Sequence, residues 1–270
     1  MFWKRKTQHF AETIDLPGLV RTWPDVKRDD CTFYHCIDLP AGEEVRGQWD
    51  LRGRMPEYIG HVDVWGKTVL DIGCASGFLT FEMERLGAAQ VVSFDADDHR
   101  RIANIPVAGS EYVVDRKKWA VGVDTFLTRM KNGYWYSHRR LGSQAACLYG
   151  DIYAIEAPDK CFDIVVVGQI LIHLRDPITA LSEAARLAKD TLVIIEGTYD
   201  SPEPTGILHA RAALQGPPYI WWLMSVPAYR NLLEMFGFRM EKVQTKSYTC
   251  VDHEYAKGKI KITTMVAKRV

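Results

Sequence analysis

Short apolar runs alternate with amphipathic stretches along most of the chain. Residues 145–149, 162–167 and 191–197 are apolar at most positions, and such runs are typical of parallel strands that are covered on both faces. Residues 176–188 instead repeat their apolar side chains at helical spacing, with Asp176 as a helix N-cap and Pro177 in the first turn. This alternation predicts an α/β fold built on a doubly wound sheet.

Two stretches interrupt the alternation and are predicted to be insertions. In the first, near 97–143, helical spacing relates the apolar residues at 119, 123, 126, 127 and 130. The second, near 198–225, carries prolines and aromatic residues and leaves the carboxyl end of a strand, where ligands bind in open α/β sheets. Beyond it, residues 240–249 and 259–267 are predicted to form two closing strands.

The first 60 residues lack this alternation. Aromatic residues stand there among prolines and glycines, and long periodic runs are few. The segment is therefore expected to lie over the rest of the chain instead of folding alone. We predict an N-terminal cap segment over residues 1–60 and one larger domain over residues 61–270, which contains both insertions.

The most specific signal is a glycine-containing turn between a strand and a helix. The apolar run at 69–72, interrupted by Asp71, is followed by Gly73 and Gly77, and a helical pattern begins at Phe78. Glycines at such a turn let a ligand approach the backbone, and the helix N-terminus offers free N–H groups. The D-x-G-x-x-x-G spacing differs from the G-x-G-x-x-G of dinucleotide sites because Phe78 replaces the third glycine. A nucleotide without a pyrophosphate fits better, which disfavours a dehydrogenase.

This motif resembles motif I of class I S-adenosylmethionine (SAM) methyltransferases, and three later elements follow in the order found in that family. Residues 91–95 end a strand pattern with an acid about 20 residues after the glycine turn. Residues 150–152 end another apolar run, and residues 162–169 resemble the family's fourth strand. The resemblance implies a seven-stranded Rossmann-like sheet, and methyl transfer with SAM as the cofactor.

The resemblance also assigns residues to the cofactor. It implies that Asp95 accepts hydrogen bonds from the ribose hydroxyls and that Asp151 binds the adenine amino group. It also implies that Gly168 and Gln169 lead to a loop beside the reacting methyl group. The complete set expected to bind SAM is Asp71, Gly73, Cys74, Ala75, Gly77, Phe78, Asp95, Ala96, Gly150, Asp151, Ile152, Gly168 and Gln169.

The segment ahead of the motif resembles the same part of the relatives of bacterial tRNA wobble-uridine carboxymethyltransferases, where a short strand and loop close one side of the SAM pocket. Those enzymes carry an acidic, tryptophan-rich stretch with lysines, one of which meets the extra carboxylate of carboxy-SAM. Residues 49–58 lack that stretch, and the cations available here are Arg46, Arg52 and Arg54. The sequence therefore favours ordinary SAM over carboxy-SAM.

Composition and charge narrow the possible partners. The 270 residues carry 34 basic and 34 acidic side chains, and this balance argues against a partner held mainly through its phosphates. The longest apolar runs have strand length, and the basic residues 1–6 are not followed by the apolar stretch of a secretory signal. The six cysteines form no C-x-x-C pair, so neither disulfides nor a metal site is expected. We predict a cytoplasmic protein without a membrane partner, and the sequence does not predict its oligomeric state.

One local cluster nevertheless has the composition of an RNA-binding surface. Aromatic and basic residues gather over 134–140, and such residues can stack on bases and pair with phosphates. A solvated helix face, or the wall of a pocket for an anionic small molecule, explains the same pattern. The cations of this region are Arg116, Lys117, Lys118, Arg129, Lys131, Arg139 and Arg140.

Methyl transfer from a sulfonium is an in-line displacement, so the protein mainly has to hold the acceptor close and aligned. A base helps where the acceptor carries a proton. His173 follows the predicted fourth strand, and we consider it the first candidate base and Tyr219 the second. A supporting role for His173 in its turn, or packing on SAM, is the alternative. Other candidate bases are Tyr199, His209, Glu196 and His138, and the residues expected to contact the acceptor are Trp135, Tyr136, His173, Tyr199, His209, Trp221 and Trp222.

The sequence thus predicts an enzyme that moves a methyl group from SAM to a small metabolite or natural product, at O, N, S or C. The alternative is a tRNA-modifying methyl- or carboxymethyltransferase that acts at a wobble uridine. A protein that binds SAM without catalysis is a third possibility.

Overall fold

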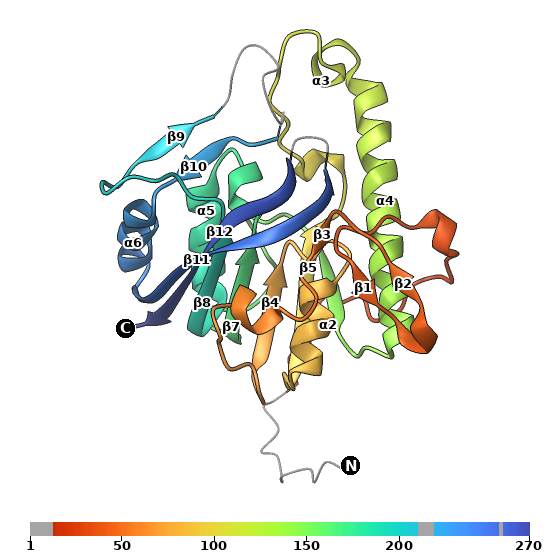
Figure 1. The fold of residues 1–270 in the computed structure, drawn as a ribbon, viewed down its shortest axis with the longest axis horizontal. Helices are drawn as coiled ribbons and strands as arrows, with labels where there is room; N and C mark the ends of the chain where they lie inside the picture. The colour runs from red at the N-terminus through yellow and green to blue at the C-terminus, as the bar shows by residue number, and fades with distance from the viewer. Residues whose placement is uncertain (1–12, 210–218, 254–255) are drawn as a thin grey trace.

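The computed structural model describes residues 13–209, 219–253 and 256–270, so the basic residues 1–6 lie outside the described part. Its main sheet has eight strands in the order β3-β11-β12-β8-β7-β4-β5-β6 (Figure 1). Neighbours from β8 to β6 are parallel, and β12 runs antiparallel to both β8 and β11. The strands are β3 Trp49–Asp50, β4 Thr68–Ile72, β5 Gln90–Ala96, β6 Ala146–Gly150, β7 Phe162–Gly168, β8 Ala188–Glu196, β11 Phe238–His253 and β12 Ala256–Arg269.

The expected seven-stranded Rossmann-like sheet accounts for every strand of this sheet except β3. That strand has two residues, comes from the predicted cap, and pairs with β11 at Thr249 and Cys250. The closing strands are longer than predicted, because their pairing begins as early as Phe238 opposite Arg269. The sheet order reverses at β4, which lies between β5 and β7, so the carboxyl end of β4 is where a ligand crevice is expected.

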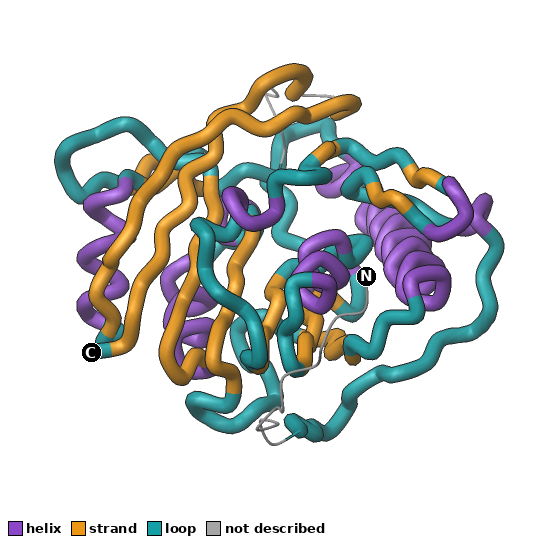
Figure 2. Tube along the Cα trace, turned by 60° about the horizontal axis from the view of Figure 1, so that its bottom comes forward, coloured by secondary structure: helices purple, strands orange, loops and turns teal. Residues whose placement is uncertain are grey.

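Helices cover both faces of the sheet (Figures 1 and 2). Ile164 and Val166 of β7 join the core under α2 Phe78–Arg85 and α4 Arg116–Leu141. Val165 and Val167 join the core under α5 Pro177–Leu187 and α6 Val226–Met235. This division explains why the strand is apolar at nearly every position. Across the described ranges, no helix combines the length and the apolar character that crossing a bilayer requires.

The remaining elements are short and lie in the cap and the two insertions. Those between β5 and β6 lead into α4, and those between β8 and α6 include the antiparallel pair β9 and β10. Residues 210–218 of the second insertion lie outside the described part. The short elements are η1 Arg28–Asp30, β1 Ile37–Asp38, η2 Pro40–Gly42, β2 Glu44–Val45, α1 Met55–Tyr58, η3 His99–Arg101, α3 Glu111–Val114, η4 Leu171–His173, β9 Gly206–Leu208 and β10 Trp222–Met224.

The cap, with β1 and β2, lies beside the second half of α4 (Figure 1). The N–H of Thr32 donates to the carbonyl oxygen of Arg129 over 2.8 Å, and the Arg129 side chain donates back to cap carbonyls. Arg139 pairs with Asp25, and Arg140 pairs with Glu43. The aromatic and basic cluster of 134–140 is part of α4 and helps to attach the cap to this helix. Arg129, Arg139 and Arg140, which suggested an RNA surface, are therefore engaged with the cap.

Replacing Gly133 with alanine is expected to lower the free energy of unfolding by about 2–3 kcal/mol, even though alanine favours a helix by about 1 kcal/mol. A Cβ at Gly133 would lie 2.2 Å from the backbone oxygen of Thr32, so the cap would have to move away from α4. Urea unfolding measures the effect. Gly122→Ala on the same helix is the control, because a Cβ there would meet open space, with no contact within 4 Å. Equal effects of the two substitutions would contradict this packing.

Candidate active site

The turn after β4 is held open by three residues with positive φ. Gly73, Ala75 and Gly77 have φ of 81°, 48° and 88°, and Gly77 is the N-cap of α2. A Cβ at Gly77 would lie 2.6 Å from the Phe81 ring, so only glycine fits there. The backbone N–H groups of Gly73 and Cys74 donate to the carbonyl oxygen of Phe94, which fixes this turn beside the end of β5.

Asp95 joins the turn to the end of β5 through its carboxylate. One oxygen accepts the N–H of Ala75 over 2.7 Å, and the other accepts the N–H of Ala96 over 2.7 Å. Burial raises the pKa of Asp95, while these hydrogen bonds act in the opposite direction. A carboxylate held at both oxygens keeps a fixed orientation, and Asp95 lines the cavity described next.

A cavity of about 590 Å³ lies at the carboxyl ends of the parallel strands, within the usual size of ligand pockets. The sheet side is formed by residues at the ends of β4, β5 and β6, which are Gly73, Phe94, Asp95, Ala96, Gly150 and Ile152. The first half of α4 supplies the opposite wall, with Trp119, Gly122, Val123, Phe126 and Leu127. The cap adds Tyr34 and Gln48, and the loop after β7 adds Ile170, His173 and Leu174. Most of these side chains are apolar.

Part of the residue set predicted to bind SAM surrounds this cavity. Five of the residues predicted to bind SAM line the cavity, namely Gly73, Asp95, Ala96, Gly150 and Ile152. A Cβ at Gly150 would meet only the Phe94 ring, at 3.9 Å, so this wall leaves space for a flat group. Asp95 presents its carboxylate to this cavity, where it can accept hydrogen bonds from a ligand.

Asp71 does not line the cavity and instead belongs to a buried network. Its carboxylate accepts the Thr80 hydroxyl over 2.6 Å, and Thr80, Ser93 and Tyr134 continue the chain of hydroxyls at 2.8 and 2.9 Å. Burial raises the pKa of Asp71 to about 7. Cys74 and Phe78 are buried in the turn as well, so these members of the predicted set support the site from behind.

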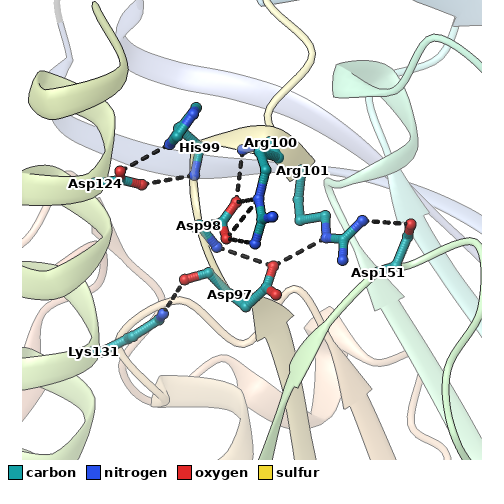
Figure 3. Close-up of polar contacts among 8 residues, drawn as sticks. All are labelled: Asp97, Asp98, His99, Arg100, Arg101, Asp124, Lys131 and Asp151. Carbon is teal, nitrogen blue, oxygen red and sulfur yellow. Dashed lines mark hydrogen bonds and ion pairs between the residues drawn. The ribbon is translucent and has the colours of Figure 1, made fainter. Parts of the chain in front are cut away.

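Asp151 lies in a network of charged groups at the end of β6 (Figure 3). Arg101 links Asp151 to the loop after β5, because it donates to Asp151 over 2.8 Å and to Asp97 over 3.0 Å. Lys131 of α4 donates to the Asp97 backbone oxygen. Asp151 lines a second cavity next to the first, and Arg101 lines both.

His173 and Tyr219 lie together in the wall of the first cavity. Nδ1 of His173 is 2.9 Å from the backbone oxygen of Tyr219, and the two rings meet edge to face at 5.3 Å. Because a carbonyl oxygen only accepts, Nδ1 carries the proton of the neutral ring and Nε2 is its basic atom.

Gly168 and Gln169 shape the loop after β7 without lining the cavity. Gln169 has φ of 50°, and its side chain donates to the Tyr58 hydroxyl over 3.3 Å.

Glu196, at the end of β8, fixes the turn that carries His173. It is fully buried, and Oε1 accepts the N–H of Leu171 over 2.7 Å. Oε2 has no hydrogen-bond partner among the described residues. Burial raises the pKa of Glu196 to about 8, so the carboxyl is mostly protonated at neutral pH. Glu196 does not line the cavity, and we consider it a positioning residue.

When the pH is raised from 6 to 9, the free energy of unfolding is expected to fall less in the Glu196→Gln variant than in the wild type. The folded wild type keeps a proton on Glu196 that the unfolded chain releases above its ordinary pKa, so its free energy of unfolding falls as the pH rises toward 8. Glutamine keeps an acceptor for Leu171 and cannot ionise. Thermal melting at both pH values measures the difference. Glu234→Gln, at an exposed site on α6, is the control and should behave as the wild type.

The residues predicted to contact the acceptor are dispersed. Trp135 is buried and donates to the Tyr149 hydroxyl over 3.0 Å, and Tyr136 donates to Glu43 of the cap over 2.6 Å. Neither lines the cavity, because the cap covers their side of α4. The Tyr199 side chain is exposed on the second insertion, and His138 contacts the Ala145 backbone oxygen at 2.9 Å.

The two tryptophans of the second insertion hold it against the site. The Trp221 N–H donates to the Ile172 backbone oxygen over 2.8 Å, and its indole N–H donates to the Ala103 backbone oxygen. The indole of Trp222 donates to the Arg175 backbone oxygen over 3.0 Å. The His209 N–H donates to the Trp221 backbone oxygen, which continues the β9–β10 pairing. These residues therefore position the insertion over the loop after β7.

The family resemblance places the segment ahead of the motif beside the SAM pocket, but sequence reasoning does not single out Tyr34 or Gln48 and does not place the helix of residues 119–130 at the cavity. Tyr34 and Gln48 reach the cavity from the cap, where Ser76 of the turn accepts the N–H of Tyr34 over 2.9 Å. The helical pattern that contains Trp119 and Phe126 is visible in the sequence, but spacing alone does not distinguish a ligand from a protein core. Among the described residues, no group of three His, Cys, Asp or Glu side chains is arranged to hold a metal ion.

Comparisons with known proteins agree with this geometry. Residues 46–243 match the family model described as a methyltransferase domain. The chain is 26% identical over 221 residues to the tRNA U34 carboxymethyltransferase of Marinobacter nauticus, covering 79% of this chain and 56% of that protein. It is 27% identical over 174 residues to the ubiquinone biosynthesis O-methyltransferase of Neisseria meningitidis, covering 64% of this chain and 60% of that protein. The chain thus spans little more than half the length of these curated relatives.

Solved structures share the fold. The 1,6-didemethyltoxoflavin-N1-methyltransferase of Burkholderia thailandensis, solved with S-adenosylhomocysteine, has a TM-score of 0.50 at 18% identity, covering 82% of this chain and 78% of that chain. A SAM-dependent methyltransferase from Methanosarcina mazei has a TM-score of 0.50 at 16% identity, covering 82% and 99%. The family match spans most of the chain, and the sheet order is that of the fold predicted from motif I. The chain therefore belongs to the methyltransferase-domain family, and its sheet has the fold of the class I SAM-dependent methyltransferases.

Proposed function

We propose that this enzyme transfers the methyl group of ordinary SAM to a small metabolite or natural product, at an oxygen, nitrogen, sulfur or carbon atom. The main support is the cavity of about 590 Å³, whose walls come from the strand ends, α4, the cap and the loop after β7. A mostly apolar wall on several sides favours an acceptor that enters the cavity as a small molecule.

The chain's own residues divide into a cofactor end and an acceptor end. Asp95 would hold the ribose, and Ala96 and Ile152 would flank the adenine, with Asp151 near its amino group. SAM supplies a methyl group that the sulfonium charge activates. The chain aligns the acceptor, and His173 takes up a proton at Nε2 where the acceptor carries one. Tyr219 supports that role, because its backbone oxygen keeps the proton of His173 on Nδ1.

Ordinary SAM is favoured because the cations ahead of the motif are engaged elsewhere. Arg52 pairs with Asp38 and Asp50, both over 2.7 Å. Arg54 pairs with Glu57 and lies 4.6 Å from the centre of the Tyr248 ring. Arg101 is the one Arg or Lys among the described residues that line the cavity, and it lies at the adenine end with Asp151. A carboxylate added to the methyl group would therefore find no Arg or Lys other than Arg101 among the described residues of the first cavity.

Modification of a tRNA wobble uridine is the second candidate. The similarity to a tRNA U34 carboxymethyltransferase over 221 residues favours it. Against it stand the zero net charge and the use of Arg139 and Arg140 to hold the cap. Only Arg116, Lys117 and Lys118 of the predicted cluster remain exposed near the start of α4, so the basic surface is smaller than the sequence suggested.

Formation of S-adenosylhomocysteine distinguishes the two candidates. The purified protein is incubated with SAM and either a panel of small phenols, amines and thiols or unmodified tRNA, and mass spectrometry follows the products. We expect turnover with a small acceptor and weak tRNA retention at physiological salt. Turnover with tRNA alone, together with tRNA binding that falls steeply with salt, would establish the second candidate instead.

A further inference from the structure

A second cavity, of about 540 Å³, adjoins the first one. The two share a wall made by Arg101, Ala103 and Trp119, among others. The second cavity is also lined by Arg116 at the start of α4 and by Arg175, two residues after His173. The function proposed above uses Asp151 and Arg101 of this cavity at the adenine end, but it gives Arg116 and Arg175 no role.

Arg116 and Arg175 are both held by one buried tyrosine. The Arg116 guanidinium lies 3.6 Å from the centre of the Tyr112 ring, and Nη2 of Arg175 donates to the Tyr112 hydroxyl over 2.7 Å. Tyr112 is only 6% exposed, so its ring is a fixed support. Two guanidinium groups are thereby held by contacts to the same fixed ring, and both arginines are exposed, so an anion can reach them.

The acidic side chains around this cavity are already engaged. Asp176 caps α5 by accepting the Thr179 N–H over 3.0 Å. Within the described ranges, neither Arg116 nor Arg175 has a carboxylate at ion-pair distance, although the other charged groups nearby do have partners. Those pairs are Arg101 with Asp97 and Asp151, Arg100 with Asp98, and His99 with Asp124 (Figure 3).

We propose that this second cavity binds the anionic group of the methyl acceptor, a carboxylate or a phosphate, through Arg116 and Arg175. The inference rests on the proposed function, and it specifies the acceptor as an anionic small molecule. Guanidinium groups suit this task because their planar N–H donors match the oxygens of both anions. Stacking on Tyr112 orients Arg116, and the Tyr112 hydroxyl orients Arg175, so little side-chain freedom is lost on binding.

The position of Arg175 connects this anion site to the acceptor end of the first cavity. Its guanidinium lies 5.2 Å from the centre of the Trp221 ring, and its backbone oxygen accepts the Trp222 indole N–H. Trp221 also donates to the backbone of η4, which carries His173. An anion on Arg175 is therefore next to the insertion that covers the loop after β7.

The test measures binding of two probes, phenyl phosphate and benzoate, to the full chain in the presence of saturating S-adenosylhomocysteine. Isothermal calorimetry gives the affinities, and the fluorescence of the nearby tryptophans provides a second signal. We expect saturable binding of at least one probe, and a loss of affinity of tenfold or more in each of Arg116→Gln and Arg175→Gln. Arg175→Lys should recover only part of the affinity, because it restores the charge without the planar fork.

Lys117→Gln is the matched control, because it removes the same charge one residue from Arg116 at an exposed site that does not line the cavity. All variants should keep the wild-type SAM affinity and melting temperature. The proposal is overturned if neither probe binds, or if Lys117→Gln weakens binding as much as the two arginine variants. Binding of a short RNA stem-loop that depends on both arginines, without binding of either probe, also overturns it and points to nucleic acid. Absence of SAM binding in the wild type would instead contradict the proposed function, whatever the probes do.

Discussion

The Asp95→Ala variant is expected to bind SAM about 100-fold more weakly than the wild type. Asp95 lines the cavity, and a hydrogen bond from a ribose hydroxyl to its carboxylate would contribute about 1.5–3 kcal/mol, so two such bonds at the lower value account for a loss of about 100-fold. The two N–H groups of Ala75 and Ala96 hold the carboxylate in place, so no reorganisation is required on binding. Isothermal calorimetry with SAM and with S-adenosylhomocysteine measures the loss.

The control for this experiment is Asp98→Ala. Asp98 lies three residues further along the chain and pairs with Arg100, and it does not line the first cavity. Its removal should change the affinity for SAM little. Because Asp95 also holds the motif turn, the melting temperature of each variant must be compared with the wild type. Unchanged affinity in a folded Asp95→Ala protein would remove Asp95 from the ribose role.

The His173→Asn variant is expected to lower kcat about 100-fold while leaving the affinity for SAM unchanged. Asparagine can place an N–H near the position of Nδ1 and keep the hydrogen bond to the Tyr219 backbone, but it offers no basic atom in place of Nε2. A positioned general base contributes about 100-fold or more to such a step. Steady-state rates with a proton-bearing acceptor, and calorimetry with SAM, separate the two effects.

Tyr219→Phe distinguishes His173 from the second candidate base. It removes the phenol hydroxyl but keeps the ring that meets His173 and the backbone oxygen that accepts from it. We expect kcat close to that of the wild type. A large loss in Tyr219→Phe with little loss in His173→Asn would assign proton uptake to the tyrosine, and an unchanged kcat in both variants would show that the acceptor loses its proton elsewhere.

The central sheet could be predicted from the sequence because its information is local. Strands such as β7 are apolar at most positions, and Val165 and Val166 face opposite cores, so the pattern itself reports burial on both sides. Gly73 comes directly after β4, and Asp95 is the second-last residue of β5, so such strands locate both residues. Their place at the strand ends brings them to one cavity in any doubly wound sheet of this order.

The acceptor end could not be predicted in the same way, because it depends on contacts between distant segments. Tyr34 reaches the cavity only because the cap backbone is fastened to Ser76. The composition of 134–140 suggests ligand binding, whereas Trp135 is covered by the cap and Arg140 is paired with Glu43. Helical spacing shows which side chains share a face, but not whether a ligand, a cap or solvent covers that face.

A single helix, α4, performs two separate tasks along its 26 residues. Its first turns supply Gly122, Val123 and Phe126 to the cavity, and its later turns hold the cap through Arg129 and Gly133. The helix adds no strand to the sheet. Substitutions in its first turns are therefore expected to change the shape of the cavity, while the strand-end residues proposed to bind SAM, such as Gly73 and Asp95, keep their positions.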